Sequence, residues 1–171
     1  MKTRLNLALL GLAFVLMLDS CGGNSAKKTT QTQPIESQPA STAEGTVSNV
    51  LSLEGNDQMQ YSKNELTATA GKTITLTFKH TGTLDKAVMG HNFILLKPGT
   101  DINAFAQKAI EAKATDYIPK SEVASIIAHT KLIGGGESDT ITFEIKDKGT
   151  YDFICSFPGH VAMMKGKLIV Q

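Results

Sequence analysis

Two segments of this chain alternate polar and apolar residues with a period of two, and this pattern constrains the fold more than any other feature. Thr73–Lys79 and Thr140–Lys146 each place an apolar side chain at every second position. Such alternation is typical of a strand with one face in a core and the other in water. Further strands are predicted at residues 47–53, 91–96, 150–155 and 167–170. No strand–helix–strand alternation connects them, so we predict an all-β sandwich.

One segment has helical rather than period-two spacing. Residues 101–113 place five apolar side chains on one helical face, and Thr100 or Asp101 can cap the start: these side chains are Ile102, Phe105, Ala106, Ala109 and Ile110. We expect a short helix packed on the outside of the sandwich. Gly134–Gly136 lies between predicted strands and no helical pattern follows it. It therefore indicates a turn and not a phosphate-binding loop.

The N-terminal end has the composition of a targeting segment. Lys2 and Arg4 precede an apolar run, Leu7–Leu18, which suits a signal peptide and is short for a membrane span. The run ends in Leu-Asp-Ser-Cys, which resembles a bacterial lipobox although Asp19 departs from its pattern. The resemblance implies cleavage before Cys21 and lipidation of its thiol. The alternative is an ordinary secreted protein with a spare cysteine.

The segment that follows Cys21 has the composition of a linker. Gly22–Gly45 is rich in Thr, Ser, Gln, Ala and Pro, and Ile35 is its only large apolar residue. Such a stretch buries too little apolar surface to offset the entropy of ordering it. The alternative is that part of it packs on the domain. We predict a lipoprotein signal peptide at 1–20, a lipidated cysteine and flexible linker at 21–45, and one folded domain at 46–171.

Charge and cysteine content exclude several classes of protein. Removal of residues 1–20 takes Lys2, Arg4 and Asp19 and leaves equal numbers of basic and acidic residues, with no arginine. Nucleic-acid binding needs a basic stripe, usually with arginine, so no nucleic-acid partner is expected. If Cys21 carries lipid, Cys155 has no partner within the chain, and a disulfide scaffold is not expected.

Five side chains of metal-ligating types gather in two short segments of the chain. Cys155, His160, Met163 and Met164 fall within ten residues, and His91 lies upstream. Two His, one Cys and one Met form the ligand set of a blue-copper electron-transfer site, because thiolate and imidazole suit both oxidation states of copper. Taken singly, each of these residues has an ordinary interpretation as a backbone-bonded histidine or as core packing. Together they predict a copper site.

Several separate segments, in order, resemble azurins, the bacterial blue-copper proteins. They are His91-Asn92-Phe93, the run from Cys155 to Gly166, Gly55–Gln60 and Ile127–Gly134. The resemblance covers nearly the whole domain. It implies a cupredoxin-like Greek-key β-sandwich with one short external helix that holds a single type 1 copper ion.

The resemblance also implies the roles of residues at the metal. His91 and His160 would be imidazole ligands, Cys155 the thiolate, Met164 the axial thioether, and the Gly90 carbonyl would lie on the opposite axial side. Asn92 would tie the two ligand-bearing loops together. Ser156 and Phe157 would shape the surroundings of the thiolate.

Beyond the ligands, the resemblance implies a docking surface for redox partners. It would consist of Met59, Met89, Phe157 and Met163 beside the His160 ring, extended by Leu84 and Val88 unless these complete the core. Met163 is therefore not expected to bind metal. His80 matches a histidine near the copper, where it would either couple protonation to redox state or be satisfied in the interior. His129 would be a surface histidine.

The implied function is transfer of single electrons in the periplasm of a bacterial cell envelope. Partners would be c-type cytochromes or other periplasmic redox proteins of the oxidase, peroxidase or nitrite reductase type, with the chain a monomer. Gly22 is not the Asp that retains lipoproteins at the inner membrane, so a lipid anchor in the outer membrane is expected. One alternative is a copper store or delivery protein. Another is a thiol enzyme using Cys155 and His160, although no residue orienting His160 is evident.

Two features depart from the azurin pattern. Azurins usually carry a disulfide, and the matching positions here are Asn49 and Lys72. They often bury a tryptophan, whereas this chain has none and Phe93 stands at one typical position. We expect packing alone to stabilise the domain, at a cost of about 2–5 kcal/mol relative to a bridged relative.

Overall fold

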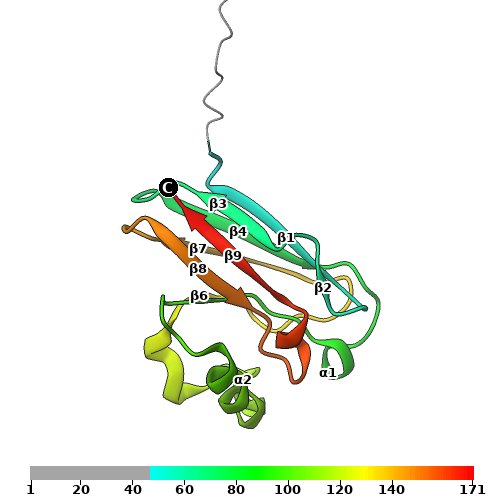
Figure 1. Ribbon diagram of the computed structural model, residues 1–171. Coiled ribbons are helices and arrows are strands. Elements are labelled where there is room, and N and C mark those ends of the chain that lie inside the picture. Colours follow the sequence, from blue (N-terminus) through cyan, green and yellow to red (C-terminus); the bar gives the residue numbers. More distant parts are fainter. Residues whose placement is uncertain (1–46) are drawn as a thin grey trace, which may run out of the picture. The chain divides into compact units, whose positions relative to one another are not determined.

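The computed structural model describes residues 47–171, which form two packed β-sheets (Figure 1). The first sheet contains, in spatial order, β2 (Gln60–Tyr61), β1 (Val50–Asn56), β4 (Thr73–His80) and β7 (Ser138–Glu144). The second contains β3 (Glu65–Ala68), β9 (Lys165–Val170), β8 (Gly149–Ile154), β5 (Ile94–Leu96) and β6 (Ile126–His129). The predicted all-β sandwich is confirmed. The predicted signal peptide, Cys21 and linker lie outside the described residues.

Period-two alternation places the core as expected. In β4, Ile74, Leu76 and Phe78 are fully buried between the sheets. The intervening threonines face outward, and Thr77 Oγ1 lies 3.0 Å from Thr140 Oγ1 on the antiparallel strand β7. The pairings of β1 with β4 and of β3 with β9 are parallel. The strands of each parallel pair are not consecutive in the chain, because other strands lie between them in sequence.

The predicted outer helix is present as α2 (Ile102–Glu111). Asp101 caps it, because its side chain accepts hydrogen bonds from the backbone amides of Asn103 (2.9 Å) and Ala104 (3.0 Å). Phe105 and Ala109 face inward and complete a second apolar cluster with Ile94, Leu96, Leu132 and Ile154. In Figure 1 this helix lies outside the second sheet.

Shorter helical elements were not predicted. They are α1 (Lys86–Met89) and the 3-10 turns η1 (Lys113–Thr115), η2 (Lys120–Ser125) and η3 (His160–Ala162). Strands β2, β3 and β6 were also missed, since β2 has two residues and β6 shows no alternation in its burial. Among residues 47–171, no helix is long and apolar enough to cross a membrane.

Some predicted boundaries were wrong by two or three residues. Strand β1 begins at Val50 and not Val47, and it continues to Asn56 because Leu51, Leu53 and Gly55 all face the interior. Strand β7 occupies 138–144 and not 140–146, and its Asp139 pairs with Phe78. Despite these shifts, the side chains that were predicted to face the core still do so.

Asn49 and Lys72, the positions that the azurin resemblance pairs, are in contact. The Asn49 side-chain amide donates to the backbone carbonyls of Thr69 (3.2 Å) and Lys72 (3.4 Å), and its oxygen accepts from the Thr69 amide (2.9 Å). Hydrogen bonds therefore join the two segments in this domain. Phe93, at the tryptophan position, is fully buried and packs on Phe153 with ring centroids 5.2 Å apart.

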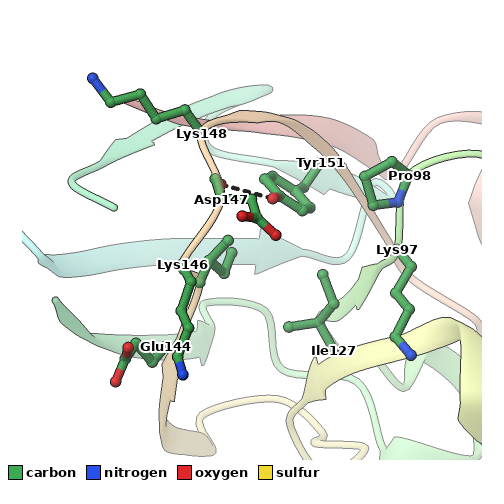
Figure 2. A pocket seen from close by; sticks show the side chains of 9 residues that line it. Lys97, Pro98, Ile127, Glu144, Lys146, Asp147, Lys148 and Tyr151 are labelled. Atoms are coloured by element: carbon green, nitrogen blue, oxygen red, sulfur yellow. Dashed lines mark hydrogen bonds between the residues drawn. The ribbon is translucent and has the colours of Figure 1, made fainter. Parts of the chain in front are cut away.

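A hollow of about 650 Å³ opens at the end of the sandwich where β5 and β7 end and where β6 and β8 begin. Figure 2 shows its lining, including Tyr151, whose hydroxyl donates to the Asp147 carbonyl (2.8 Å). The predicted ligands lie at the other ends of these strands, since Cys155 follows the end of β8 and His91 precedes β5. The hollow is therefore separate from the metal centre.

Candidate metal centre

The predicted ligands converge from two segments of the chain. His91 lies between α1 and β5, where it forms an isolated bridge with Ile133. Cys155 follows β8, His160 begins η3, and Met164 immediately precedes β9. All four are buried. The loop between β8 and β9 and the helix α1 lie at the same end of the sandwich (Figure 1).

Backbone geometry explains how the loop returns to its starting point. Pro158 and Gly159 form the centre of a type II turn, in which Gly159 adopts φ 83° and ψ −16° and the His160 amide donates to the Phe157 carbonyl (3.0 Å). The Met164 amide then donates to the His160 carbonyl (2.8 Å), and the Cys155 amide donates to the Met164 carbonyl (2.9 Å). The loop is thus closed by its own backbone.

The ligand atoms of the two histidines and the cysteine meet in one place. The Nδ1 atoms of His91 and His160 are 3.1 Å apart, and the Cys155 Sγ lies 4.0 Å and 3.7 Å from them. Among the described residues this is the cluster of three or more His, Cys, Asp or Glu ligand atoms close enough to hold a metal ion. The cluster is fully enclosed, which is typical of a site built for one ion.

Hydrogen bonding fixes the tautomer of His91. Its Nε2–H donates to the Asn56 carbonyl oxygen (2.8 Å), so the Nδ1 lone pair faces His160 and the thiol. Met164 and His91 both lie against Gly55: a Cβ added to Gly55 would lie 3.0 Å from His91 Cδ2 and 3.3 Å from Met164 Cε. Glycine at position 55 therefore gives both side chains their room. Two imidazoles, a thiol and a thioether in a dry site fit copper.

Burial keeps the ligands uncharged in the metal-free protein. It raises the pKa of Cys155 to about 12, against which hydrogen bonds from neighbouring backbone act weakly. It lowers the pKa of His160 to about 4, with His91 and His80 adding to the effect. Burial also lowers the pKa of His91. At neutral pH the site holds a thiol and two neutral imidazoles, and a metal must displace the thiol proton to bind.

The lowered pKa values predict that acid destabilises the metal-free domain. Between pH 7 and pH 5 the histidines of the unfolded chain take up protons near pH 6.5, while His160 in the folded domain stays neutral until about pH 4. Because His160 takes up a proton in this range only in the unfolded state, the free energy of unfolding falls as the pH falls. Urea unfolding at pH 7, 6 and 5, followed by circular dichroism, should show this decline.

His160→Gln provides the control for this pH dependence. Glutamine does not titrate, so the decline between pH 7 and pH 5 should be smaller in the variant than in the wild type. Asp57 and Glu122 add little in this window, because their pKa values are lowered from values already below 5. An equal decline in both proteins would contradict the burial of a neutral His160.

Asn92 joins the two ligand-bearing segments. Its Oδ1 accepts from the Ser156 amide (2.9 Å), and its Nδ2 donates to Ser156 Oγ (2.9 Å). Both residues are buried, and each is adjacent in sequence to a metal ligand. The contact predicted for Asn92 is therefore present. Phe157 is half-buried, and its ring lies 4.6 Å from the His160 ring, centroid to centroid.

Gly90 precedes His91 in a crowded position. A Cβ at Gly90 would lie 2.5 Å from the Lys86 carbonyl oxygen of α1, closer than atoms can approach. Only glycine lets the chain pass this close to α1. The axial role of the Gly90 carbonyl stays a prediction.

Two tyrosines contribute contacts that the sequence did not reveal. The Tyr61 hydroxyl donates to the Asn92 carbonyl (2.6 Å), and burial raises the pKa of this phenol. The carbonyl of Tyr117 accepts from Ser156 Oγ (2.8 Å). Tyrosines carry no spacing signal for such backbone contacts, so only the folded arrangement shows them.

His80 is satisfied in the interior and lies against a ligand. Its Nδ1 accepts from the Gly82 amide (3.0 Å), its Nε2 donates to the Met89 carbonyl (2.8 Å), and its ring stacks on His91 at 4.4 Å. His80 is therefore satisfied in the interior, and its coupling to the redox state stays a prediction. His129 is exposed, as expected for a surface histidine.

The predicted docking residues are partly or fully exposed. Met163 is 58% exposed, while Met59, Met89 and Phe157 are intermediate. Leu84 and Val88 are 40% and 63% exposed, so they do not complete the core. His160 itself is nearly covered, at 3% exposure. Apolar side chains thus reach solvent on the helix α1 and on the ligand loop.

Comparison with known proteins identifies the family. Residues 47–171 match the family model of copper binding proteins of the plastocyanin/azurin family. The chain belongs to this family. It is 42% identical over 125 residues to an azurin of Pseudomonas denitrificans, a match that covers 71% of this chain and 97% of that protein. Nearly the whole of that azurin therefore corresponds to the domain described here.

Two further relatives extend the comparison. Outer membrane protein H.8 of Neisseria gonorrhoeae is 43% identical over 120 residues, covering 68% of this chain and 64% of that protein. The solved structure of auracyanin from Roseiflexus castenholzii superposes with a TM-score of 0.65 at 38% identity, covering 73% of this chain and 98% of that one. The predicted cupredoxin fold is confirmed, and the cofactor of this azurin-like domain is copper. His91, Cys155, His160 and Met164 are arranged as a type 1 copper site.

Proposed function

We propose that this chain is a type 1 copper electron-transfer protein that carries single electrons between redox partners in a bacterial cell envelope. The observation that carries the proposal is the enclosed cluster of His91, Cys155 and His160, with buried Met164 beside it. When bound there, copper supplies a one-electron couple between its Cu(I) and Cu(II) states. The domain would act as a carrier and not as an enzyme.

The rigidity of the site supports this role. Hydrogen bonds hold the ligand residues in place: the His91 ring donates to the Asn56 carbonyl, the Cys155 amide donates to the Met164 carbonyl, and the His160 amide closes the type II turn. Ligands that cannot move far change little between oxidation states. A small structural change keeps the barrier to electron transfer low.

Apolar side chains around the ligand loop are the proposed docking surface. We define it as Met59, Met89, Phe157 and Met163, with exposed Leu84 and Val88 beside them. A redox partner docking there would approach the His160 ring through Phe157, which lies 4.6 Å from it. The surface is uncharged, so a flat apolar partner surface fits it.

Met163→Glu is expected to slow electron exchange with a c-type cytochrome and to leave the blue colour intact. Docking would bury the new carboxylate without a partner, which costs at least about 1.4 kcal/mol and slows exchange at least about tenfold. The measurement is stopped-flow mixing of the reduced, copper-loaded domain with an oxidised cytochrome.

Val123→Glu is the matched control, since Val123 is equally exposed, at 58%, and lies in η2 away from the ligand loop. This variant should exchange electrons at the wild-type rate. Equal rates for wild type and Met163→Glu would remove the docking surface from the account.

The N-terminal segment supports a position in the cell envelope. The lipobox-like residues before Cys21 suggest a lipid anchor, and the linker at 22–45 would let the domain reach partners away from the membrane. The name of the H.8 relative, an outer membrane protein, supports the same placement. We propose a monomer anchored at the outer membrane that meets c-type cytochromes or other periplasmic redox proteins.

A copper store or delivery protein is the second candidate function. Delivery favours exposed sites from which the ion exchanges readily, whereas Cys155, His91 and Met164 are fully buried here. The cytochrome experiment separates the two functions. A store would hold copper and transfer no electrons on the timescale of mixing.

A further inference from the structure

The segment between β5 and β6 contains two consecutive residues in a strained backbone conformation. Asp116 and Tyr117 adopt φ values of 54° and 61°, in the left-handed region that residues other than glycine rarely occupy. A pair of this kind persists only where its surroundings hold it in place. The contacts of these two residues show what holds them.

Both strained residues direct their carbonyl groups at the metal loops. Asn92 Nδ2 lies 3.4 Å from the Asp116 carbonyl oxygen, and Ser156 Oγ donates to the Tyr117 carbonyl (2.8 Å). Asn92 and Ser156 are the residues that follow the ligands His91 and Cys155 in the sequence. The left-handed turn therefore binds the two ligand-bearing segments at one point.

The side chain of Tyr117 reaches the same loop by a second route. Its ring contacts Phe157 edge-on, with centroids 5.1 Å apart and planes at 67°, and the Phe157 ring in turn contacts His160 at 4.6 Å. Three rings thus connect the segment after α2 with a copper ligand. Tyr117 is 9% exposed and belongs to the apolar cluster beneath α2.

A hollow beside these rings explains why Phe157 needs the contact with Tyr117 to keep its position. A hollow of about 310 Å³ lies next to Tyr117 and Phe157, bounded also by Leu132 and by the charged side chains of Lys86 and Lys113. Phe157 is only half-buried, so it has room to turn away from His160 if the Tyr117 ring is removed. The Tyr117 ring blocks this rotation of Phe157.

We propose that Tyr117 is a positioning residue for the copper loop. Its carbonyl holds Ser156 and its ring holds Phe157, which keeps the His160 ring in one orientation in both oxidation states. The positioning role rests on the geometry of the loop. Its effect on electron transfer rests on the proposed electron-transfer function. The two parts can be measured separately.

The test compares three variants of the domain 46–171, which corresponds to nearly the whole length of the azurin relative. Tyr117→Leu removes the ring and keeps an apolar side chain. Phe105→Leu removes a ring from the same cluster at a position in α2 and is the control for lost stability. Tyr117→Phe keeps the ring and should restore wild-type behaviour.

The first measurement is amide hydrogen exchange in the metal-free domain. The Ser156 and His160 amides donate to Asn92 Oδ1 and to the Phe157 carbonyl, so they report on the loop. Loss of an aromatic pair predicts an exchange rate about two- to tenfold higher at these amides in Tyr117→Leu than in Phe105→Leu. Amides in β4 should exchange alike in the two variants.

The second measurement is electron self-exchange in the copper-loaded domain. In Tyr117→Leu the His160 ring would reorient when the oxidation state changes. Electron self-exchange should therefore be slower in Tyr117→Leu than in Phe105→Leu, by a similar factor of about two to ten. If wild type itself exchanges no electrons, the proposed function fails, and hydrogen exchange still decides the positioning role.

Three results would overturn the inference. They are equal effects of Tyr117→Leu and Phe105→Leu at the loop amides, wild-type exchange in Tyr117→Leu, and failure of Tyr117→Phe to restore the loop. If Tyr117→Leu does not fold, Tyr117→Met supplies a closer match in volume without a ring, and the same outcomes apply to it.

Discussion

Replacing Asn92 with alanine is expected to lower the free energy of unfolding of the metal-free domain by about 3 kcal/mol. The variant loses both hydrogen bonds to Ser156 and leaves the buried Ser156 amide without its acceptor. A buried donor that loses its partner bears the full cost of its desolvation. Urea unfolding of the domain 46–171, followed by circular dichroism, measures the change.

Asn56→Ala is a matched control for this substitution. The Asn56 side chain also accepts backbone hydrogen bonds, from Gln58 (3.0 Å) and Gln60 (3.1 Å), but it does so in an exposed turn where water can replace it. Its loss should cost about 1 kcal/mol or less. Equal costs for the two variants would show that Asn92 does not join the ligand loops as the structure indicates.

Copper binding is expected to stabilise the domain strongly. At a free copper concentration about a thousandfold above Kd, the free energy of unfolding rises by about 4 kcal/mol, since the ligands converge only in the folded state. The structure supports this because His91 comes from a segment far in sequence from the loop that holds Cys155 and His160. Thermal unfolding with and without copper, followed by circular dichroism, measures the gain.

Two variants separate specific binding from adventitious binding. Cys155→Ala removes the thiol at the centre of the cluster and should lose most of the copper-dependent gain. Met163→Leu removes the neighbouring, exposed thioether and should keep all of it. A gain of equal size in Cys155→Ala would mean that copper binds elsewhere on the domain.

Most of the core could be predicted from the sequence because burial follows strand periodicity. The inward faces of β4 and β7 match the alternation in residues 73–79 and 140–146. Chain order gives no information about pairing, so the parallel neighbours β1–β4 and β3–β9 were not predicted. Strand β6 was missed because its side chains are half-buried without alternation.

The metal ligands were predicted because their residue types and spacing carry the chemistry. The supporting contacts were only partly predictable. Asn92 and Ser156 were predicted from the azurin resemblance. The contacts of Tyr61 and Tyr117 are made by a hydroxyl and by a backbone carbonyl, and the surrounding sequence indicates neither contact. Left-handed Asp116 and Tyr117 lack the glycine that normally marks such a turn. Their conformation is fixed by tertiary contacts and not by local preference.

The asparagine at position 49 illustrates how a departure from the family pattern is accommodated. The sequence indicated only that a disulfide was missing. In the folded domain, the Asn49 side chain donates two hydrogen bonds and accepts one, and these three bonds join the segments that the bridge would join. Each such bond contributes about 1 kcal/mol, so together they offset part of the expected loss.

A visible absorption spectrum tests the central claim most directly. One equivalent of Cu(II) is added to the domain 46–171 and, in parallel, to Cys155→Ala. The type 1 site predicts an intense blue band in the wild type and none in the variant, because the band arises from copper bonded to the Cys155 thiolate. A pale spectrum that is identical in both proteins would contradict a copper–thiolate site and, with it, the proposed electron-transfer function.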